Sequence, residues 1–204
     1  MDEHRHQAGV RRDYVRKRLV VIDVSNTNPI DRATLGELGP EALYCKATEG
    51  TWFKDATYGG HRQLAKAEGV PFGGYLFLHP RSPGNEAQYF LTYAKPRAGD
   101  LQPVIDAEVR DAATFAQVAA RVDSCAKVLE GAGFKPLLYS YTSFLQNLLT
   151  AEPDLSRLRV WQAAYTMTRP KVGQGASVVL WQFTDHLHGY DASKRYVPLS
   201  DLVI

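Results

Sequence analysis

The sequence predicts an α/β fold, a single abridged (β/α) barrel of about eight strands with an incomplete set of helices. Short apolar runs alternate along the chain with segments of helical periodicity, which is typical of parallel strands joined by right-handed crossovers. These runs are largely apolar, as expected for strands buried on both faces. The chain has 204 residues, fewer than the roughly 250 of a complete eight-helix barrel, so we expect some helices to be missing.

The apolar runs are the predicted strands; the first of them reads RLVVID and the fourth reads LQPVIDAE. Seven strands are predicted at residues 18–23, 41–48, 70–79, 101–108, 135–141, 157–165 and 177–184. A short eighth strand is expected near Gly189. Together these segments are enough to close a small barrel.

Helices are predicted between the early strands from capping residues and from apolar residues at helical spacing. One helix covers residues 55–69, with Asp55 as the N-cap and Gly69 as the stop, and a shorter one covers residues 85–94. A third follows Asp111, and its apolar face consists of Phe115, Val118, Ala119, Val122, Ala126 and Leu129. Later in the chain the helical segments shorten and the strands follow one another more closely.

No linker, repeat or low-complexity segment divides the chain. The predicted organisation is therefore a basic N-terminal arm, residues 1–17, and a barrel domain, residues 18–204. The arm, which contains most of the stretch RRDYVRKR, is expected to be solvated, with binding to a surface as the alternative. The N-terminus lacks the apolar segment of a secretory signal peptide, and no window approaches the ~18 apolar residues of a membrane span.

Composition narrows the function classes. Hydrophobic residues make up 45% of the chain and charged residues 23%, enough for one sizeable core. The net charge of +2 is too small to argue for nucleic acid. Cys45 and Cys125 both lie in apolar patterns and are predicted to be small core residues. The histidines show no metal-ligand spacing, so we predict neither a metal nor a cofactor.

The strand ends carry polar and aromatic residues, and in a β/α barrel the active site forms at the C-terminal ends of the strands. The residues at these ends are Asp23, Lys46, Glu49, Tyr75, Phe77, His79, Asp106, Glu108, Tyr139, Tyr141, Trp161, Gln162, Tyr165, Trp181, Gln182 and, slightly later, Asp191. Aromatic faces pack against the apolar faces of sugar rings, and carboxylates bind sugar hydroxyls. The set therefore favours a carbohydrate site.

Asp106 and Glu108 are two positions apart, so on a strand both side chains point to the same face. Two nearby carboxyls resist ionising together, which raises the pKa of one of them and keeps a proton available for a leaving oxygen. Glycoside hydrolysis needs such a proton donor beside a second carboxylate. The spacing alone also fits two exposed acids in a strand-to-helix loop, with Asp111 as a helix cap.

Five segments, in order, resemble glycoside hydrolase family 25, the lysozymes that cleave bacterial peptidoglycan between N-acetylmuramic acid and N-acetylglucosamine. They are VIDVS (21–25), KATEGTWFKD (46–55), GVPFGGYLF (69–77), PVIDAE (103–108) and LWQFT…GYDAS (180–193). The resemblance runs from about residue 18 to the C-terminus. It implies a catalytic β/α barrel with an incomplete helix set, in agreement with the strand pattern.

The resemblance also implies roles for single residues. Glu108 matches the general acid, and Asp106 matches the companion acid that assists the acetamido group of the substrate or the charged transition state. Asp23 and Asp191 match the remaining acids of the family's pocket. Aromatic sugar contacts of the family fall at Tyr75, Tyr139, Trp161 and Trp181.

Two departures keep an alternative open. The family often has a tryptophan after its first Asp motif, which is absent from DVSNTNPID, and commonly a histidine at the position of Leu76, whereas His79 lies downstream. The alternative is a non-catalytic glycan-binding or structural barrel module of a phage or cell-wall protein. A barrel acting on another sugar polymer such as chitin is more distant. Lys46 and Glu49 are expected to form a structural ion pair, and His79 to lie in a loop or at the rim.

The expected partner is the glycan strand of bacterial peptidoglycan, with no nucleic acid and no membrane span, and the chain is expected to be a monomer. An enzyme acting on the cell wall without a signal peptide would be a phage lysin released through a membrane lesion, a virion-associated protein, or a protein exported by another route. A domain taken from a longer chain is also consistent with the sequence.

Overall fold

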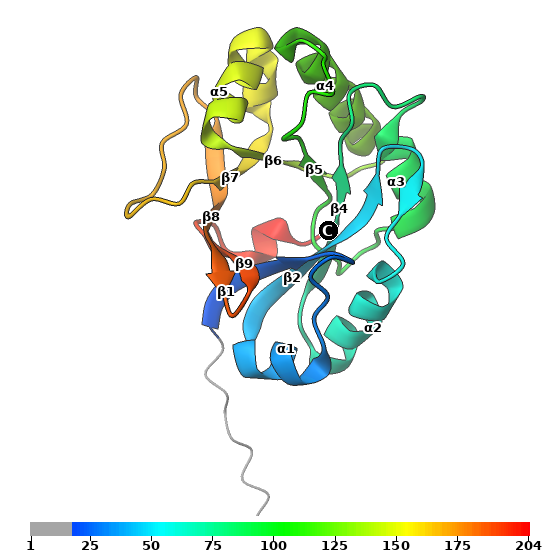
Figure 1. Ribbon diagram of the computed structural model, residues 1–204, viewed down its shortest axis with the longest axis vertical. Helices are drawn as coiled ribbons and strands as arrows, with labels where there is room; N and C mark the ends of the chain where they lie inside the picture. Colours follow the sequence, from blue (N-terminus) through cyan, green and yellow to red (C-terminus); the bar gives the residue numbers. More distant parts are fainter. Residues whose placement is uncertain (1–17) are drawn as a thin grey trace, which may run out of the picture.

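Eight strands close into a barrel in the computed structural model, which describes residues 18–204 (Figure 1). Around the ring they are β1 (Arg18–Val24), β2 (Pro40–Glu49), β4 (Phe72–Phe77), β5 (Val104–Asp106), β6 (Leu137–Tyr141), β7 (Arg159–Ala163), β8 (Ser177–Leu187) and β9 (Tyr190–Arg195). β9 pairs with β1 and closes the ring. The predicted abridged barrel is confirmed, whereas the basic arm at residues 1–17 lies outside the described part of the chain.

The last strand runs in the opposite direction to the others. The strands from β1 to β8 in the ring pair in parallel, and β9 is antiparallel to both of its neighbours. His188 and Gly189 form a two-residue turn between the paired residues Leu187 and Tyr190, and both have positive φ, 55° and 86°. Such turns make tight hairpins. The eighth strand expected near Gly189 is therefore present, as the second arm of a hairpin.

In the described part of the chain, five α-helices lie outside the ring, from α1 at the bottom of Figure 1 through α2 and α3 on the right to α4 and α5 at the top. They are α1 (Arg32–Leu38), α2 (Tyr58–Glu68), α3 (Glu86–Ala94), α4 (Phe115–Gly131) and α5 (Thr142–Ala151). The three predicted helices correspond to α2, α3 and α4. The other two were not predicted, because α1 has only seven residues and α5 begins directly after β6 without a loop.

The start of α2 differs from the prediction. Asp55 is not its N-cap, because its carboxylate accepts hydrogen bonds from the backbone N–H groups of Asn26 and Thr57, both at 2.8 Å. The helix begins at Tyr58, and Thr57 stands at the cap position. Gly69 ends the helix as expected, in the left-handed conformation. Asp55 therefore ties the loop after β1 to the start of α2.

A stack of aromatic and cationic side chains covers β8 and β9. In the described part of the chain, no α-helix follows β7 or β8 before β9. The rings of Trp181 and Tyr196 stack with an interplanar angle of 8° and a centroid separation of 6.4 Å. The Arg169 guanidinium lies 3.8 Å from the centroid of Tyr196, and Lys194 lies 4.9 Å from that of Phe183. These side chains shield the outer face of the hairpin in place of a helix.

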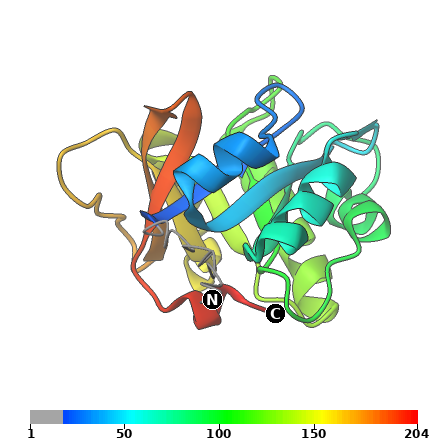
Figure 2. The ribbon, with the colours of Figure 1, turned by 90° about the horizontal axis from the view of Figure 1, so that it is seen from below.

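The core has two parts, one between the strands and the helices and one inside the barrel. Inside, the Tyr44 and Trp161 rings pack 5.1 Å apart. Gly73 makes room for the Tyr44 ring, since a Cβ there would lie 2.5 Å from it. The C-terminal 3₁₀ helix (Leu199–Leu202) closes the lower end, with the Gln102 N–H bonded to the Leu202 carbonyl at 2.7 Å (Figure 2). A pocket lined with polar side chains lies at the opposite end of the barrel.

Two smaller expectations concern the core and the membrane. Cys45 and Cys125 are free thiols and both are buried, as predicted. Within residues 18–204, no helix has the length and apolar character needed to cross a membrane.

Candidate active site

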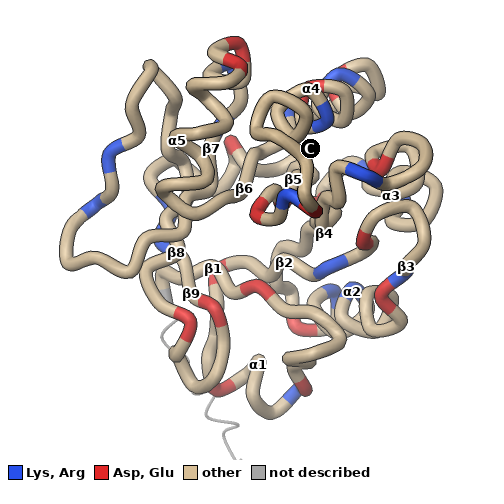
Figure 3. The backbone as a smooth tube through the Cα atoms, turned by 45° about the horizontal axis from the view of Figure 1, so that its top comes forward, with Lys and Arg blue, Asp and Glu red and all other residues tan. Residues whose placement is uncertain are grey.

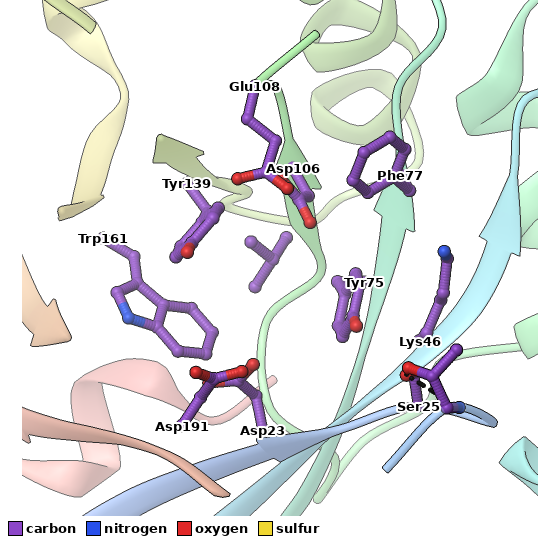
Figure 4. A pocket seen from close by; sticks show the side chains of 12 residues that line it. Asp23, Ser25, Lys46, Tyr75, Phe77, Asp106, Glu108, Tyr139, Trp161 and Asp191 are labelled. Atoms are coloured by element: carbon purple, nitrogen blue, oxygen red, sulfur yellow. Dashed lines mark hydrogen bonds between the residues drawn. The ribbon is translucent and has the colours of Figure 1, made fainter. Parts of the chain in front are cut away.

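A pocket opens at the C-terminal ends of the parallel strands (Figure 4). Its walls come from the ends of seven strands and from the loop after β1. The lining residues are Asp23, Ser25, Thr27, Lys46, Tyr75, Phe77, Val104, Asp106, Glu108, Tyr139, Trp161 and Asp191. All four predicted acids are among them, and Figure 3 shows acidic residues on β1, on β9 and near β5.

Asp23 and Asp191 meet because β9 closes the barrel against β1. They are direct partners in the antiparallel register, and in Figure 4 their carboxylates lie side by side, across the pocket from Asp106 and Glu108. The Gln182 side-chain amide donates to Asp191 Oδ1 at 2.9 Å. Asp23 Oδ2 is buried and has no hydrogen-bond partner among the described residues. The pair thus has few internal donors to neutralise it.

Asp106 and Glu108 point into the pocket from one extended segment. Asp106 ends β5, and the chain stays extended because the Ala107 N–H donates to the Tyr139 carbonyl at 3.0 Å. Ala107 packs into the outer core, so the residues on either side of it face the barrel interior. The expectation that both acids share one face is confirmed. Asp106 is 7% exposed, and its Oδ1 is buried without a hydrogen-bond partner in the described chain.

Burial is the largest cause of a raised pKa at all four carboxyls. The charge of Asp191 raises the pKa of Asp23 and of Glu108 further. The charge of Glu108 does the same for the pKa of Asp106, which is raised well above its ordinary range. The Lys46 ammonium opposes these effects at Asp106 and Glu108. The cluster therefore keeps protons at a pH where isolated carboxyls have lost them.

A chain of charged side chains leads from the pocket to its rim. Lys46 forms an ion pair with Glu49, as expected, and also lines the pocket. Glu49 Oε1 lies 3.0 Å from His79 Nε2, and His79 Nδ1 lies 2.6 Å from Asp111 Oδ2. The residues Asp111 and Ala112 have φ of 46° and 63°, uncommon for residues with a side chain. His79 therefore ties β2 to the turn that follows Glu108.

Three of the four predicted aromatic contacts line the pocket. Tyr75 and Tyr139 do so, and Trp161 is fixed by a hydrogen bond from its indole N–H to the Ser193 hydroxyl at 2.9 Å. Trp181 does not line the pocket, contrary to the prediction. It pairs in register with Gln162, and its indole N–H donates to the Ala164 carbonyl at 2.7 Å. Its ring faces outward against Tyr196, so it belongs to the stack that covers β8 and β9 rather than to the pocket.

Other residues near the site were assigned no role by the sequence. Ser25 and Thr27 line the pocket in the loop after β1, where their hydroxyls lie 2.7 Å apart. A second hollow shares Glu108 and Tyr139 with the pocket and continues along Tyr141, Thr142, Ser143, Ala163, Ala164 and Tyr165. Tyr141 and Tyr165, both noted at strand ends, are exposed there. Polar loop residues such as Thr27 give no sequence signal of their own.

Comparison with known proteins identifies the family of the chain. The family model of glycosyl hydrolases family 25 matches residues 22–191, a span that begins just before Asp23 and ends at Asp191. An autolytic lysozyme of Clostridium acetobutylicum is 31% identical over 165 residues, which is 80% of this chain and 50% of that protein. The chain spans about half the length of the curated relatives it matches.

Solved structures show the same fold. The muramidase from Acremonium alcalophilum aligns with a TM-score of 0.80 and 20% identity, over 91% of this chain and 97% of that one. The catalytic domain of endolysin ply40 from bacteriophage P40 of Listeria monocytogenes aligns with a TM-score of 0.69 and 22% identity, over 90% and 96% of the two chains. At these identities the structural likeness describes the barrel alone.

Proposed function

The chain belongs to glycosyl hydrolase family 25, and from that premise we propose that it hydrolyses the β-1,4 bond between N-acetylmuramic acid and N-acetylglucosamine in bacterial peptidoglycan. The observation that carries the proposal is the gathering of Asp23, Asp106, Glu108 and Asp191 in one pocket with raised pKa values. Burying four carboxyls together is unfavourable for folding. Glycoside hydrolysis, in contrast, needs a protonated acid beside a charged one.

In this proposal Glu108 is the general acid. It lies in the mouth of the pocket and in the adjoining hollow, so its carboxyl can reach a glycosidic oxygen between two sugars. Glu108 gives its proton to that oxygen as the bond to C1 breaks. Asp191 supports this role because its charge raises the pKa of Glu108.

Asp106 is the companion acid. We propose that the acetamido oxygen of N-acetylmuramic acid attacks C1 as the leaving oxygen departs, while Asp106 accepts a hydrogen bond from the acetamido N–H. Water then adds to C1, and its proton returns to Glu108. The outcome is net retention of the anomeric configuration, which NMR of the first-formed anomer tests directly.

The leaving sugar is assigned to the second hollow. This hollow begins at Glu108 and offers the exposed rings of Tyr141 and Tyr165 to a sugar face. The bound N-acetylmuramic acid then lies in the pocket between the four acids, against Tyr75, Tyr139 and Trp161.

The partner is the glycan strand of a bacterial wall, bound by a monomeric chain whose domain organisation is the barrel at 18–204 with the arm at 1–17. The protein would reach the wall after phage release, on a virion or by another export route. Loss of turbidity of several bacterial walls, compared with chitin oligomers as the alternative substrate, tests the proposal. Binding to walls without release of soluble fragments would instead support a non-catalytic glycan-binding module.

A further inference from the structure

Trp52 is exposed at the rim of the barrel, outside the residues that line the pocket. The chain has three tryptophans. Trp161 and Trp181 are 2% and 6% exposed, whereas Trp52 is 56% exposed. An indole left in water costs free energy relative to a buried one.

The turn that carries Trp52 is held by strand pairing and by hydrogen bonds. It joins β2 to the short strand β3 (Phe53–Lys54), whose residue Phe53 pairs with Glu49. The Gly50 N–H donates to the Phe77 carbonyl at 3.0 Å, and the Thr51 hydroxyl donates to the Pro83 carbonyl at 2.8 Å. The turn is thereby anchored to β4 and to the loop after it.

The indole ring also packs against its surroundings. Gly50 has φ of 52°, and a Cβ there would lie 2.5 Å from ring atoms of Trp52, so the ring lies directly over the glycine. The His79 ring also lies beside it, 5.1 Å away between centroids. His79 is in turn held by Glu49 and Asp111. Trp52 is thus an exposed aromatic surface that is already ordered.

The same rings lead back to the pocket. The centroid of His79 lies 5.3 Å from that of Phe77, and Phe77 lines the pocket. Trp52, His79 and Phe77 form a continuous series of tilted rings from the rim to the site of the acids. The series lies on the β2–β4 side, whereas the second hollow lies at β6 and β7.

We propose that Trp52 is a further substrate-binding residue, a stacking platform for a sugar ring of the same glycan strand beyond the pocket, with His79 as the positioning residue that holds it. This inference rests on the proposed function. The occupant is a sugar because a strand filling the pocket continues past it, and because a fixed indole beside polar groups suits the apolar face of a pyranose with hydroxyls at its edge. A fixed platform also avoids the entropic cost of ordering a surface side chain on binding.

Iodide quenching of tryptophan fluorescence isolates this platform, because Trp52 is the accessible indole. The binding protein is the Glu108→Gln variant, which is titrated with purified glycan fragments of increasing length. We expect long fragments to protect the emission from iodide and a disaccharide that fills the pocket alone to leave it open to quenching. Trp52→Phe in the same background should lose the quenchable emission, which confirms its source.

The second measurement is the steady-state kinetics of Trp52 variants that keep Glu108. In Trp52→Ala, the ratio of KM for long strands to KM for short fragments should rise about tenfold, as for loss of one aromatic anchor. Trp52→Tyr should restore most of it. The matched control is Leu19→Ala, which removes an exposed apolar side chain near the start of β1.

The outcomes separate two failures. If the protein cleaves and binds glycan but long fragments leave Trp52 open to iodide and Trp52→Ala keeps the wild-type KM ratio, the platform is refuted and the hydrolase stands. If the wild-type protein neither binds nor cleaves any glycan, the proposed function itself is refuted and the platform with it.

Discussion

Asp23 on β1 and Asp191 on β9 are direct partners across an antiparallel strand pair, although they lie near opposite ends of the chain. The hairpin that reverses β9 places them together. Like-charged residues directly opposite each other in a sheet are destabilising, and here burial raises the pKa of both. The closure of the barrel therefore assembles half of the acid cluster, and the following predictions depend on its charge.

Asp191→Asn should move the basic limb of the kcat/KM pH profile to lower pH. The charge of Asp191 raises the pKa of Glu108, so its removal lets Glu108 lose its proton at lower pH, and activity falls earlier as pH rises. Asp201→Asn, an equal charge change on the C-terminal 3₁₀ helix, is the control. A basic limb that stays in place, or moves to higher pH, would contradict the role of Asp191.

Lys46→Met should move the same limb in the opposite direction. The Lys46 ammonium lowers the pKa of Asp106 and of Glu108, so without it the proton on Glu108 is held to higher pH. The hydrogen bond between Glu49 and His79 does not involve Lys46, so we expect it to remain in this variant. Equal shifts of the two variants toward low pH would show that the limb reports something other than Glu108.

Asp106→Asn should stabilise the fold at neutral pH while it lowers activity. The folded pKa of Asp106 is raised by burial, whereas the unfolded value is about 3.9. The folded state therefore binds more protons, and the carboxyl costs stability increasingly as pH rises above about 4 toward its folded pKa. We expect the Tm at pH 7 to rise by roughly 2–4 °C, about 1 kcal/mol for a domain of this size. The gain should vanish below about pH 3.5, where the carboxyl is protonated in both states; a gain that persists there would have another cause.

Trp181→Ala should lower the free energy of unfolding by about 3 kcal/mol, as for loss of a packed aromatic ring. Its KM for peptidoglycan should stay within about twofold of wild type in the folded protein, because the ring packs on Tyr196 outside the pocket. Trp161→Phe is the contrasting variant, since Trp161 lines the pocket. Denaturant unfolding and initial rates separate the two effects, and a large rise in KM for Trp181→Ala would return that residue to the site.

The order of the elements was predictable from the sequence because parallel strands buried on both faces read as apolar runs. The same was true of the acids, since Asp23, Asp106 and Asp191 stand at or near the ends of such runs. The direction of β9 was not predicted, although His188-Gly189 carries a hairpin turn. Positive φ at a non-glycine residue such as His188 depends on the surrounding sheet as well as on the residue itself.

Side-chain direction was harder to predict than position. Trp161 and Trp181 look alike in sequence, each followed by glutamine after an apolar run. The register shift between Val160 and Trp161 where β7 pairs with β8 leaves Trp161 opposite Leu180 and Trp181 opposite Gln162, so the two rings face opposite sides. Trp52 was overlooked for a related reason: its order comes from Gly50 and His79, which meet it only in the folded chain.

Glu108 supplies the proton in the proposed reaction, and the release of reducing sugar ends from purified peptidoglycan measures that step. Glu108→Gln should lower the rate by at least about a thousandfold, since it removes the acid on which bond cleavage depends, with unchanged circular dichroism and binding to the same walls. Glu37→Gln, the same change on the exposed face of α1, should keep the wild-type rate. A Glu108→Gln protein that releases reducing ends at the wild-type rate would show that Glu108 is not the general acid.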